Sequence, residues 1–235
     1  MKTVSWFSAG VSSAVATKLV IDDIDEIFYI HIRDQHRDTL RFVDECERWF
    51  GKPIKRLQSP LESVENACRM ASYVNGPRGA ACTLRLKKRV RKAWEAKQLE
   101  SLCYVWGLDA DETDRAVRIC KENPRQTHRF PLQEQHITKE GAHQILKASG
   151  IKRPAMYELG YHNNNCIGCV KGGMGYWNKI RQDFPEVFAS RAAMERAIGA
   201  TCINGIYLDE LDPEAGRHEG PICDDCGIFC ELMAL

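Results

Sequence analysis

Residues 1–20 read MKTVSWFSAGVSSAVATKLV. Residues 3–7 are mostly β-branched or aromatic, which is typical of a short strand, and apolar residues recur at helical spacing from Ala14 onward. Between them lies the small-residue segment 8–13, Ser-Ala-Gly-Val-Ser-Ser. Glycine lets the backbone approach an anion closely, and the first free N–H groups of a helix point toward such an anion. The segment therefore predicts a phosphate-binding loop between a strand and a helix.

The same residues permit a second interpretation, a secretory signal peptide cleaved after Ala14-Val15-Ala16. Its positive region would be Lys2 alone, and four serines interrupt its apolar stretch. The mature chain would also carry 11 cysteines, an odd number, into an oxidising space. These features favour the loop.

Composition narrows the class of protein. The chain has 235 residues, which suffice for one large domain or for one domain with a small appendage. A net charge of +1 gives no general attraction to nucleic acid or to a membrane, and no apolar run is long enough to span one. The many cysteines suit a reducing compartment with metal or redox chemistry, so we expect a cytoplasmic protein.

Apolar runs alternate with amphipathic segments along the first two thirds of the chain. Strands are predicted at 3–7, 26–33, 53–57 and 102–106, and helices at 39–50, 62–74, 83–97, 112–120 and 138–148. This alternation predicts an α/β fold, doubly wound, with a mostly parallel sheet and flanking helices. Ligands of such sheets bind beyond the carboxyl ends of the strands.

The character of the sequence changes at about residue 155. Glycine, cysteine and asparagine become more frequent, and only 189–198 has a firm helical pattern. We expect a nucleotide-binding α/β domain at 1–154 and a smaller cysteine-rich region at 155–235 packed on it.

Several motifs follow one another in a fixed order. They are Ser8-x-Gly10-x-Ser12-Ser13, Ala81-Cys82-Thr83-x-Arg85-Leu86-Lys87, Gly107-x-Asp109-x-x-Glu112-x-x-Arg115, Cys166-x-x-Cys169 and Asp225-Cys226-Gly227-Ile228-Phe229. This order resembles the phosphoadenosine phosphosulfate (PAPS) reductase family, within the PP-loop adenine-nucleotide enzymes, and looks closest to its divergent, often phage-encoded, members. The resemblance covers roughly residues 3–170 and the tail, and it implies an adenine nucleotide alpha-hydrolase-like fold.

The resemblance implies a set of residues around an adenine nucleotide: Ser8, Gly10, Ser12, Ser13, Arg85, Lys87, Gly107, Asp109, Glu112 and Arg115. The phosphate loop of PP-loop enzymes is Ser-Gly-Gly-x-Asp-Ser, and here Ala9 replaces the middle glycine and Ser12 the aspartate. Because magnesium prefers carboxylate oxygen, the missing aspartate favours nucleotide binding without ATP cleavage.

Residues 85–92 hold six cations, of which Arg85 and Lys87 match a family segment near the anionic substrate. The other four form either a solvated helix face or a surface for nucleic acid.

The pair Cys166 and Cys169 can hold one metal ion or cluster, and the intervening glycine lets backbone N–H groups reach sulfur. By resemblance, Cys82 joins this pair as a ligand of an iron–sulfur cluster. Three ligands leave a [4Fe–4S] cluster with an open iron or with a fourth ligand from the tail. The alternative is a pair of structural thiols near a turn.

The tail also has two interpretations. The family's reductases end in Glu-Cys-Gly-Ile/Leu-His, which makes Cys226 the expected catalytic nucleophile, although Phe229 stands where the family has histidine. Alternatively, four thiolates hold structural zinc, namely those of Cys202, Cys223, Cys226 and Cys230.

Three functions remain open from the sequence. The first is thiol-dependent reduction of a sulfonucleotide, with a thioredoxin-type protein as the reductant. The second is an ATP pyrophosphatase that adenylates and thiolates nucleic acid with an iron–sulfur cluster. The third is a nucleotide-binding protein without catalysis.

Overall fold

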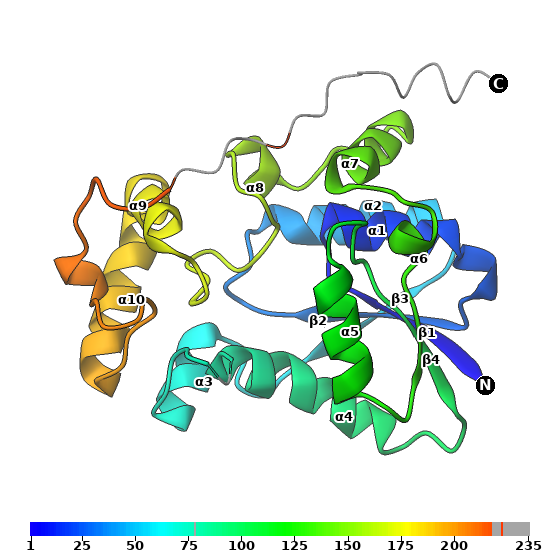
Figure 1. Cartoon of the computed structure of the whole chain (residues 1–235), viewed down its shortest axis with the longest axis horizontal. Coiled ribbons are helices and arrows are strands. Elements are labelled where there is room, and N and C mark those ends of the chain that lie inside the picture. The colour runs from blue at the N-terminus through cyan, green and yellow to red at the C-terminus, as the bar shows by residue number, and fades with distance from the viewer. Residues whose placement is uncertain (78, 218–221, 223–235) are drawn as a thin grey trace.

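The chain folds around a five-stranded parallel sheet, seen in a computed structural model that describes residues 1–77, 79–217 and 222 (Figure 1). The strands lie in the order β3-β2-β1-β4-β5. Their bounds are Lys2–Phe7 (β1), Glu26–His31 (β2), Ile54–Gln58 (β3), Leu102–Val105 (β4) and Thr127–Arg129 (β5). Because the order reverses direction at β1, the crevice above β1 and β4 is where such a sheet binds its ligand.

Helices cover both faces of this sheet, as the doubly wound prediction requires (Figure 1). One face packs against the helices Val11–Leu19 (α1), Asp38–Phe50 (α2), Pro131–Glu134 (α6) and Lys139–Ala148 (α7). On the other face, Trp94 of Arg89–Glu95 (α4) contacts the ring of Phe28 and packs against the apolar cluster that also contains Val4 and Tyr104. Side chains that alternate along a central strand are therefore buried on both sides, which explains why these strands are almost wholly apolar in the sequence.

The described residues that follow 154 form three helices, Ala155–Glu158 (α8), Met174–Asp183 (α9) and Pro185–Ile198 (α10), and the 3₁₀ turn Leu208–Glu210 (η3). Trp177 of α9 and Met194 of α10 are fully buried in the same apolar cluster as Cys68 of helix Val64–Ala71 (α3). The region after 154 thus shares its core with the first part of the chain. A division at residue 154 stays a prediction.

Several predicted elements differ in their bounds. The helix expected at 83–97 consists of a π-helical turn, Thr83–Lys88 (η2), followed by α4. The helix expected at 62–74 is shorter, because Ser72 at φ +46° ends α3. The sequence pattern predicts neither β5 nor α9, and α10 begins four residues before the predicted 189.

The position of residues 2–19 in the fold disfavours the signal-peptide interpretation. They form the central strand β1 and the buried helix α1, which agrees with the loop interpretation of 8–13. Among the helices that the structure describes, none has the length and apolar character needed to cross a membrane.

Candidate functional site

The turn between β1 and α1 leaves backbone amides free at the start of the helix. Ala9 adopts φ +60°, in the left-handed region, and the Ser8 N–H donates to Ser13 Oγ at 2.9 Å. Within the described residues, the amides of Gly10, Ser12 and Ser13 donate to no protein acceptor. Free amides and serine hydroxyls are donors that a phosphate-like anion can accept from, so the phosphate-binding role of this turn stays a prediction that the local geometry allows.

A second segment reaches this turn from the end of β4. Gly107 lies so close to α1 that a Cβ atom there would be 2.3 Å from the Cα atom of Ser13. Two residues later, the N–H of Asp109 donates to Glu112 Oε2 at 3.3 Å. Glu112 also binds Arg115 at 2.6 Å, at the start of helix Thr113–Glu122 (α5). The fold therefore brings Gly107 to the phosphate loop, whereas the exposed guanidinium of Arg115 pairs with Glu112.

Asp109 is a buried carboxyl group, only 7% exposed, close to this loop. Burial raises its pKa above the ordinary 3.8, the neighbouring Glu112 raises it further, and Lys139 lowers it. Because the charged form is disfavoured in the folded state, the ionised carboxylate reduces stability at neutral pH.

Asp109→Asn should therefore raise the free energy of unfolding at pH 7.5. The wild type loses stability as pH rises from about 4 through the raised folded pKa, and the uncharged variant does not. Urea unfolding at pH 4 and pH 7.5 measures the difference, which should shrink at the lower pH. Asp111→Asn, an exposed neighbour whose charge contributes less to the raised pKa of Asp109, should show a much smaller difference, and a gap that widens at pH 4 would contradict the assignment.

The side chains of Asn164 and Tyr157 hold the phosphate loop in place. No sequence motif indicates this role for either residue. Asn164 Nδ2 donates to the carbonyl oxygen of Ala9 at 2.7 Å and to Thr39 Oγ1 at 3.2 Å. The Val11 N–H donates to the hydroxyl of the buried Tyr157 at 3.3 Å. Neither contact has a local sequence pattern, because the partners are more than 120 residues apart.

The cysteine loop 166–169 is fixed by its backbone. Cys166 forms an antiparallel bridge with Gln35, and the Ile167 N–H donates to the Asp34 carbonyl oxygen at 2.8 Å. The Tyr176 hydroxyl accepts the Cys169 N–H at 2.8 Å and donates to the Cys166 carbonyl at 3.2 Å. The amides of Ile167 and Cys169 thus donate to oxygen in this structure, and backbone donation to sulfur stays a prediction. Tyr176 makes two polar contacts here, although its sequence context indicates a packing residue.

Two of the three thiols that the resemblance groups together, those of Cys82 and Cys166, have raised pKa values. Burial raises the pKa of Cys82, and the neighbouring Cys169 raises it further, whereas Lys87 and Lys171 lower it. Burial raises the pKa of Cys166 to about 12, although Lys87 opposes this change. Neutral thiols are therefore favoured unless a metal or a cationic environment replaces the proton.

The thiols suit a thiophilic metal in their chemistry, because soft sulfur donors select iron–sulfur clusters or zinc. In the described ranges, however, no three His, Cys, Asp or Glu side chains are placed to hold a metal ion. The residue types suit an iron–sulfur group, but the described side chains do not form a site for one, so its presence stays a proposal.

The second metal set falls largely outside the described residues, as does the expected nucleophile: Cys223, Cys226 and Cys230 lie beyond residue 222. Cys202 is described, and it is buried with its N–H donating to Glu195. Zinc ligation by the tail and the role of Cys226 remain predictions.

The basic run 85–92 is partly neutralised by the fold. Lys88 pairs with Glu122 at 2.7 Å, and Arg91 pairs with Glu95 at 3.0 Å while lying over the ring of Trp106. Arg85 donates to the Met70 carbonyl at 3.5 Å. Lys87 lies near the thiols, so of the two expected anion-binding cations it is the one that the fold places beside the cysteines.

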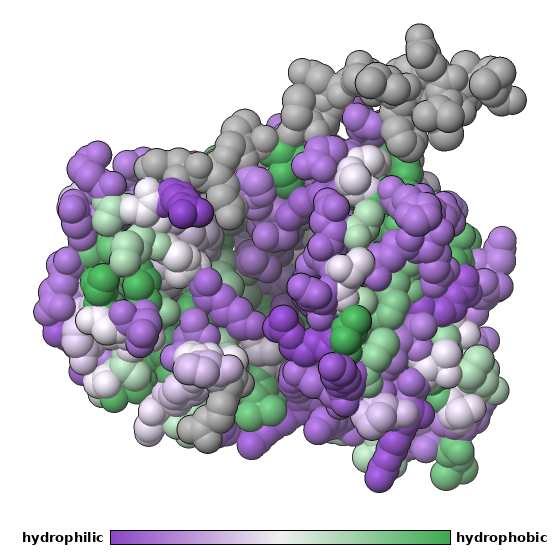
Figure 2. Space-filling model, viewed as in Figure 1, coloured by the Kyte–Doolittle hydropathy of each residue, from purple (hydrophilic) through white to green (hydrophobic). Residues whose placement is uncertain are grey.

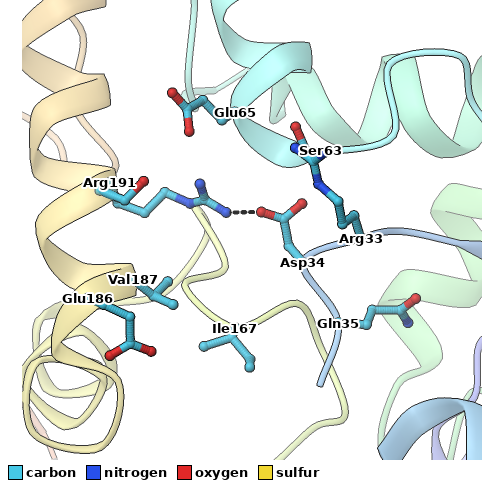
Figure 3. A pocket seen from close by; sticks show the side chains of 10 residues that line it. Arg33, Asp34, Gln35, Ser63, Glu65, Ile167, Glu186, Val187 and Arg191 are labelled. Atoms are coloured by element: carbon cyan, nitrogen blue, oxygen red, sulfur yellow. Dashed lines mark hydrogen bonds and ion pairs between the residues drawn. The ribbon is translucent and has the colours of Figure 1, made fainter. Parts of the chain in front are cut away.

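A pocket of about 370 Å³ lies beside the cysteine loop, between α3 and α10 (Figure 3). Ile167 and the paired Asp34 and Arg191 line it, together with Ser63 and Glu65. None of the expected nucleotide-binding residues does. Figure 2 shows a hollow with hydrophilic walls between the α9–α10 side of the molecule and the α5 side.

Comparison with models of protein families shows to which family this chain belongs. The model of the phosphoadenosine phosphosulfate reductase domain matches residues 2–172. The chain belongs to the PAPS reductase family. Comparison with the curated proteins gives no match.

The match places the chain among the nucleotide-binding members of the PP-loop class of enzymes. The PAPS reductase domain as matched includes the phosphate loop, the basic run, the segment after β4 and the cysteine loop. The helices α9 and α10, which pack against α3 and the cysteine loop, lie beyond it.

Proposed function

We propose that the protein binds an adenine sulfonucleotide and reduces it with thiols. The observation that carries this proposal is the segment 164–169. Asn164 bonds to the phosphate loop at 2.7 Å, and Cys166 follows two residues later beside Cys82 and Cys169. A nucleotide whose phosphate occupies the loop therefore lies near thiols and near the ammonium group of Lys87.

The proposed chemistry requires one nucleophilic thiolate, for which the family likeness indicates Cys226. The thiolate forms a bond to the sulfur of the sulfonucleotide while the bond from that sulfur to the phosphate oxygen breaks, and the nucleoside phosphate leaves. One thiol of a thioredoxin-type dithiol then attacks the enzyme sulfur, which breaks the sulfur–sulfur bond, releases sulfite and leaves a mixed disulfide. The second thiol attacks its partner sulfur in that mixed disulfide, so the dithiol is oxidised to a disulfide, one of its protons restores the cysteine thiol and the other goes to the released sulfite. A cluster held by Cys82, Cys166 and Cys169 would supply iron beside the bound nucleotide.

Anaerobic incubation with a sulfonucleotide and reduced thioredoxin tests the proposal by measuring sulfite. Sulfite release should be abolished in Cys226→Ser and unchanged in Cys120→Ser, an exposed cysteine on α5. Full activity of Cys226→Ser would remove the nucleophile. Nucleotide binding without turnover, under any reductant, would favour the non-catalytic function.

A second function is favoured by the charge of the segment 87–92. Lys87, Arg89 and Lys92 form no ion pair with another described residue, so they remain free to bind phosphate groups. We propose as the runner-up an ATP pyrophosphatase that acts on nucleic acid. Pyrophosphate release from ATP that RNA or DNA stimulates would replace the reductase proposal with this one.

A further inference from the structure

Asn164 occupies the junction between two parts of the site. Its side chain is buried, with the residue 6% exposed, and it belongs to the segment that leads into the cysteine loop. Its amide group donates to Ala9 at 2.7 Å, and its Oδ1 lies 3.3 Å from the hydroxyl of Thr39 on α2. The Asn164 backbone N–H and the Val11 N–H both point to the Tyr157 hydroxyl.

The bond to Ala9 acts on a strained residue. Ala9 has φ +60°, where a residue with a Cβ atom is uncommon, so the surrounding contacts must hold it there. The same peptide unit carries the Gly10 N–H, one of the free amides of the anion site. Moving the Ala9 carbonyl would therefore turn the Gly10 N–H away from a bound phosphate.

On its other side, Asn164 is separated from Cys166 by one residue. Cys166 is paired with Gln35, and Ile167 is bound to the Asp34 carbonyl oxygen, so this backbone has little freedom to absorb a shift. A displacement of the Ala9 peptide is thus transmitted to the thiols through one short connection, which starts at the buried Asn164 side chain.

We infer that Asn164 is a positioning residue that couples the phosphate loop to the cysteine loop, so that an anion in the loop changes the reactivity of Cys166 and Cys169. This inference depends on the proposed function in one respect, namely that the anion is a nucleoside phosphate. When one side chain fixes the arrangement of two sites, a ligand bound at either site changes the conformation and therefore the reactivity or affinity of the other.

The test measures the alkylation rate of individual cysteines by iodoacetamide, followed by mass spectrometry, with and without saturating AMP. In the wild type, AMP should slow the alkylation of Cys166 and Cys169 about fivefold and leave the exposed Cys120 unchanged. Asn164→Ala should reduce this effect to less than about twofold at saturation. Loss of one or two hydrogen bonds should also weaken AMP binding about tenfold.

The matched control is Asn163→Ala. Asn163 is exposed and only accepts a hydrogen bond from Lys139, so this variant should behave as the wild type. If AMP protects the thiols of Asn164→Ala as fully as those of the wild type, the nucleotide shields them directly and the coupling is wrong. If the wild type binds AMP without any change at Cys166 and Cys169, the coupling is also wrong.

Two further measurements separate this inference from the proposed function. If AMP does not bind the wild type, the proposal that the loop binds a nucleotide is wrong. The alkylation rates of Cys166 and Cys169 without AMP still test the role of Asn164. Asn164→Ala should then alkylate several times faster at Cys166 and Cys169, and equal rates would overturn the inference. Thr39→Val, which keeps the shape of the side chain, should move the rates in the same direction by a smaller factor, even if the Asn164→Ala protein folds poorly.

Discussion

Gly107→Ala should abolish nucleotide binding and lower the free energy of unfolding by more than about 3 kcal/mol. The added Cβ atom would be 2.3 Å from Cα, 2.6 Å from N and 2.8 Å from Cβ of Ser13. Two of these three atoms are backbone atoms of the first turn of α1, so no rotamer change relieves the contact. Either α1 moves away from β4 or the segment 107–109 moves, and both displacements deform the phosphate loop.

Gly173→Ala is the matched control for this substitution. Gly173 also precedes a helix, it has φ −79°, and a Cβ atom there would meet nothing within 4 Å. Calorimetric titration with AMP should give the wild-type affinity for this control, and urea unfolding should show a loss below about 1 kcal/mol, because alanine is a poorer N-cap of α9 than glycine. A Gly107→Ala protein that binds AMP normally would show that the close approach to Ser13 is not needed for the loop.

Arg191→Met should destabilise the fold by about 3 kcal/mol, because it leaves the carboxylate of Asp34, whose side chain is only 13% exposed, without its cation. Arg191 is 3% exposed and pairs with Asp34, and its Nε donates to the Gly168 carbonyl at 3.4 Å. Asp34 also accepts the Val64 N–H at 2.7 Å at the start of α3. One guanidinium therefore joins α10 to the loop after β2 and to the cysteine loop (Figure 3).

An exposed arginine on the same helix provides the comparison. Arg196 is 43% exposed and pairs with Asp209 and Glu210 at the surface, so Arg196→Met should destabilise the fold far less than Arg191→Met does. The double variant Asp34→Asn with Arg191→Met should recover part of the loss, because it removes the unpaired charge. Urea unfolding that gives Arg191→Met and Arg196→Met equal losses would contradict the role of the buried pair.

The sheet could be predicted where burial imposes a pattern. The strands β1, β2 and β4 are buried on both faces, so they stand out as apolar runs, and the phosphate loop follows directly from its position between β1 and α1. The three-residue β5 is only partly buried and has no apolar run, which explains why the sequence does not reveal it. The glycines before α9 obscure that helix, although Pro185 marks the first position of α10.

The candidate site also has a part that the sequence predicts and a part that it does not. Motifs local in sequence, such as Ser8–Ser13 and Cys166–Cys169, could be found by their spacing. The contacts that position them could not, because Asn164 meets Ala9 across 155 residues and Arg191 meets Asp34 across 157. Each of these side chains is an ordinary polar residue until the fold supplies its partner.

The π-helical turn η2 limits how this family member can change in length during evolution. A π-helical turn contains an additional residue compared with an α-helical turn, and such turns occur often at functional sites. Deleting one residue from 83–86 would let the segment wind as an ordinary helix, but it would rotate Lys87 by about 100° relative to Cys82. The ammonium group would then no longer lie near both Cys82 and Cys166, as it does in this fold. Relatives that conserve the thiols should therefore accept substitutions in this turn more readily than insertions or deletions.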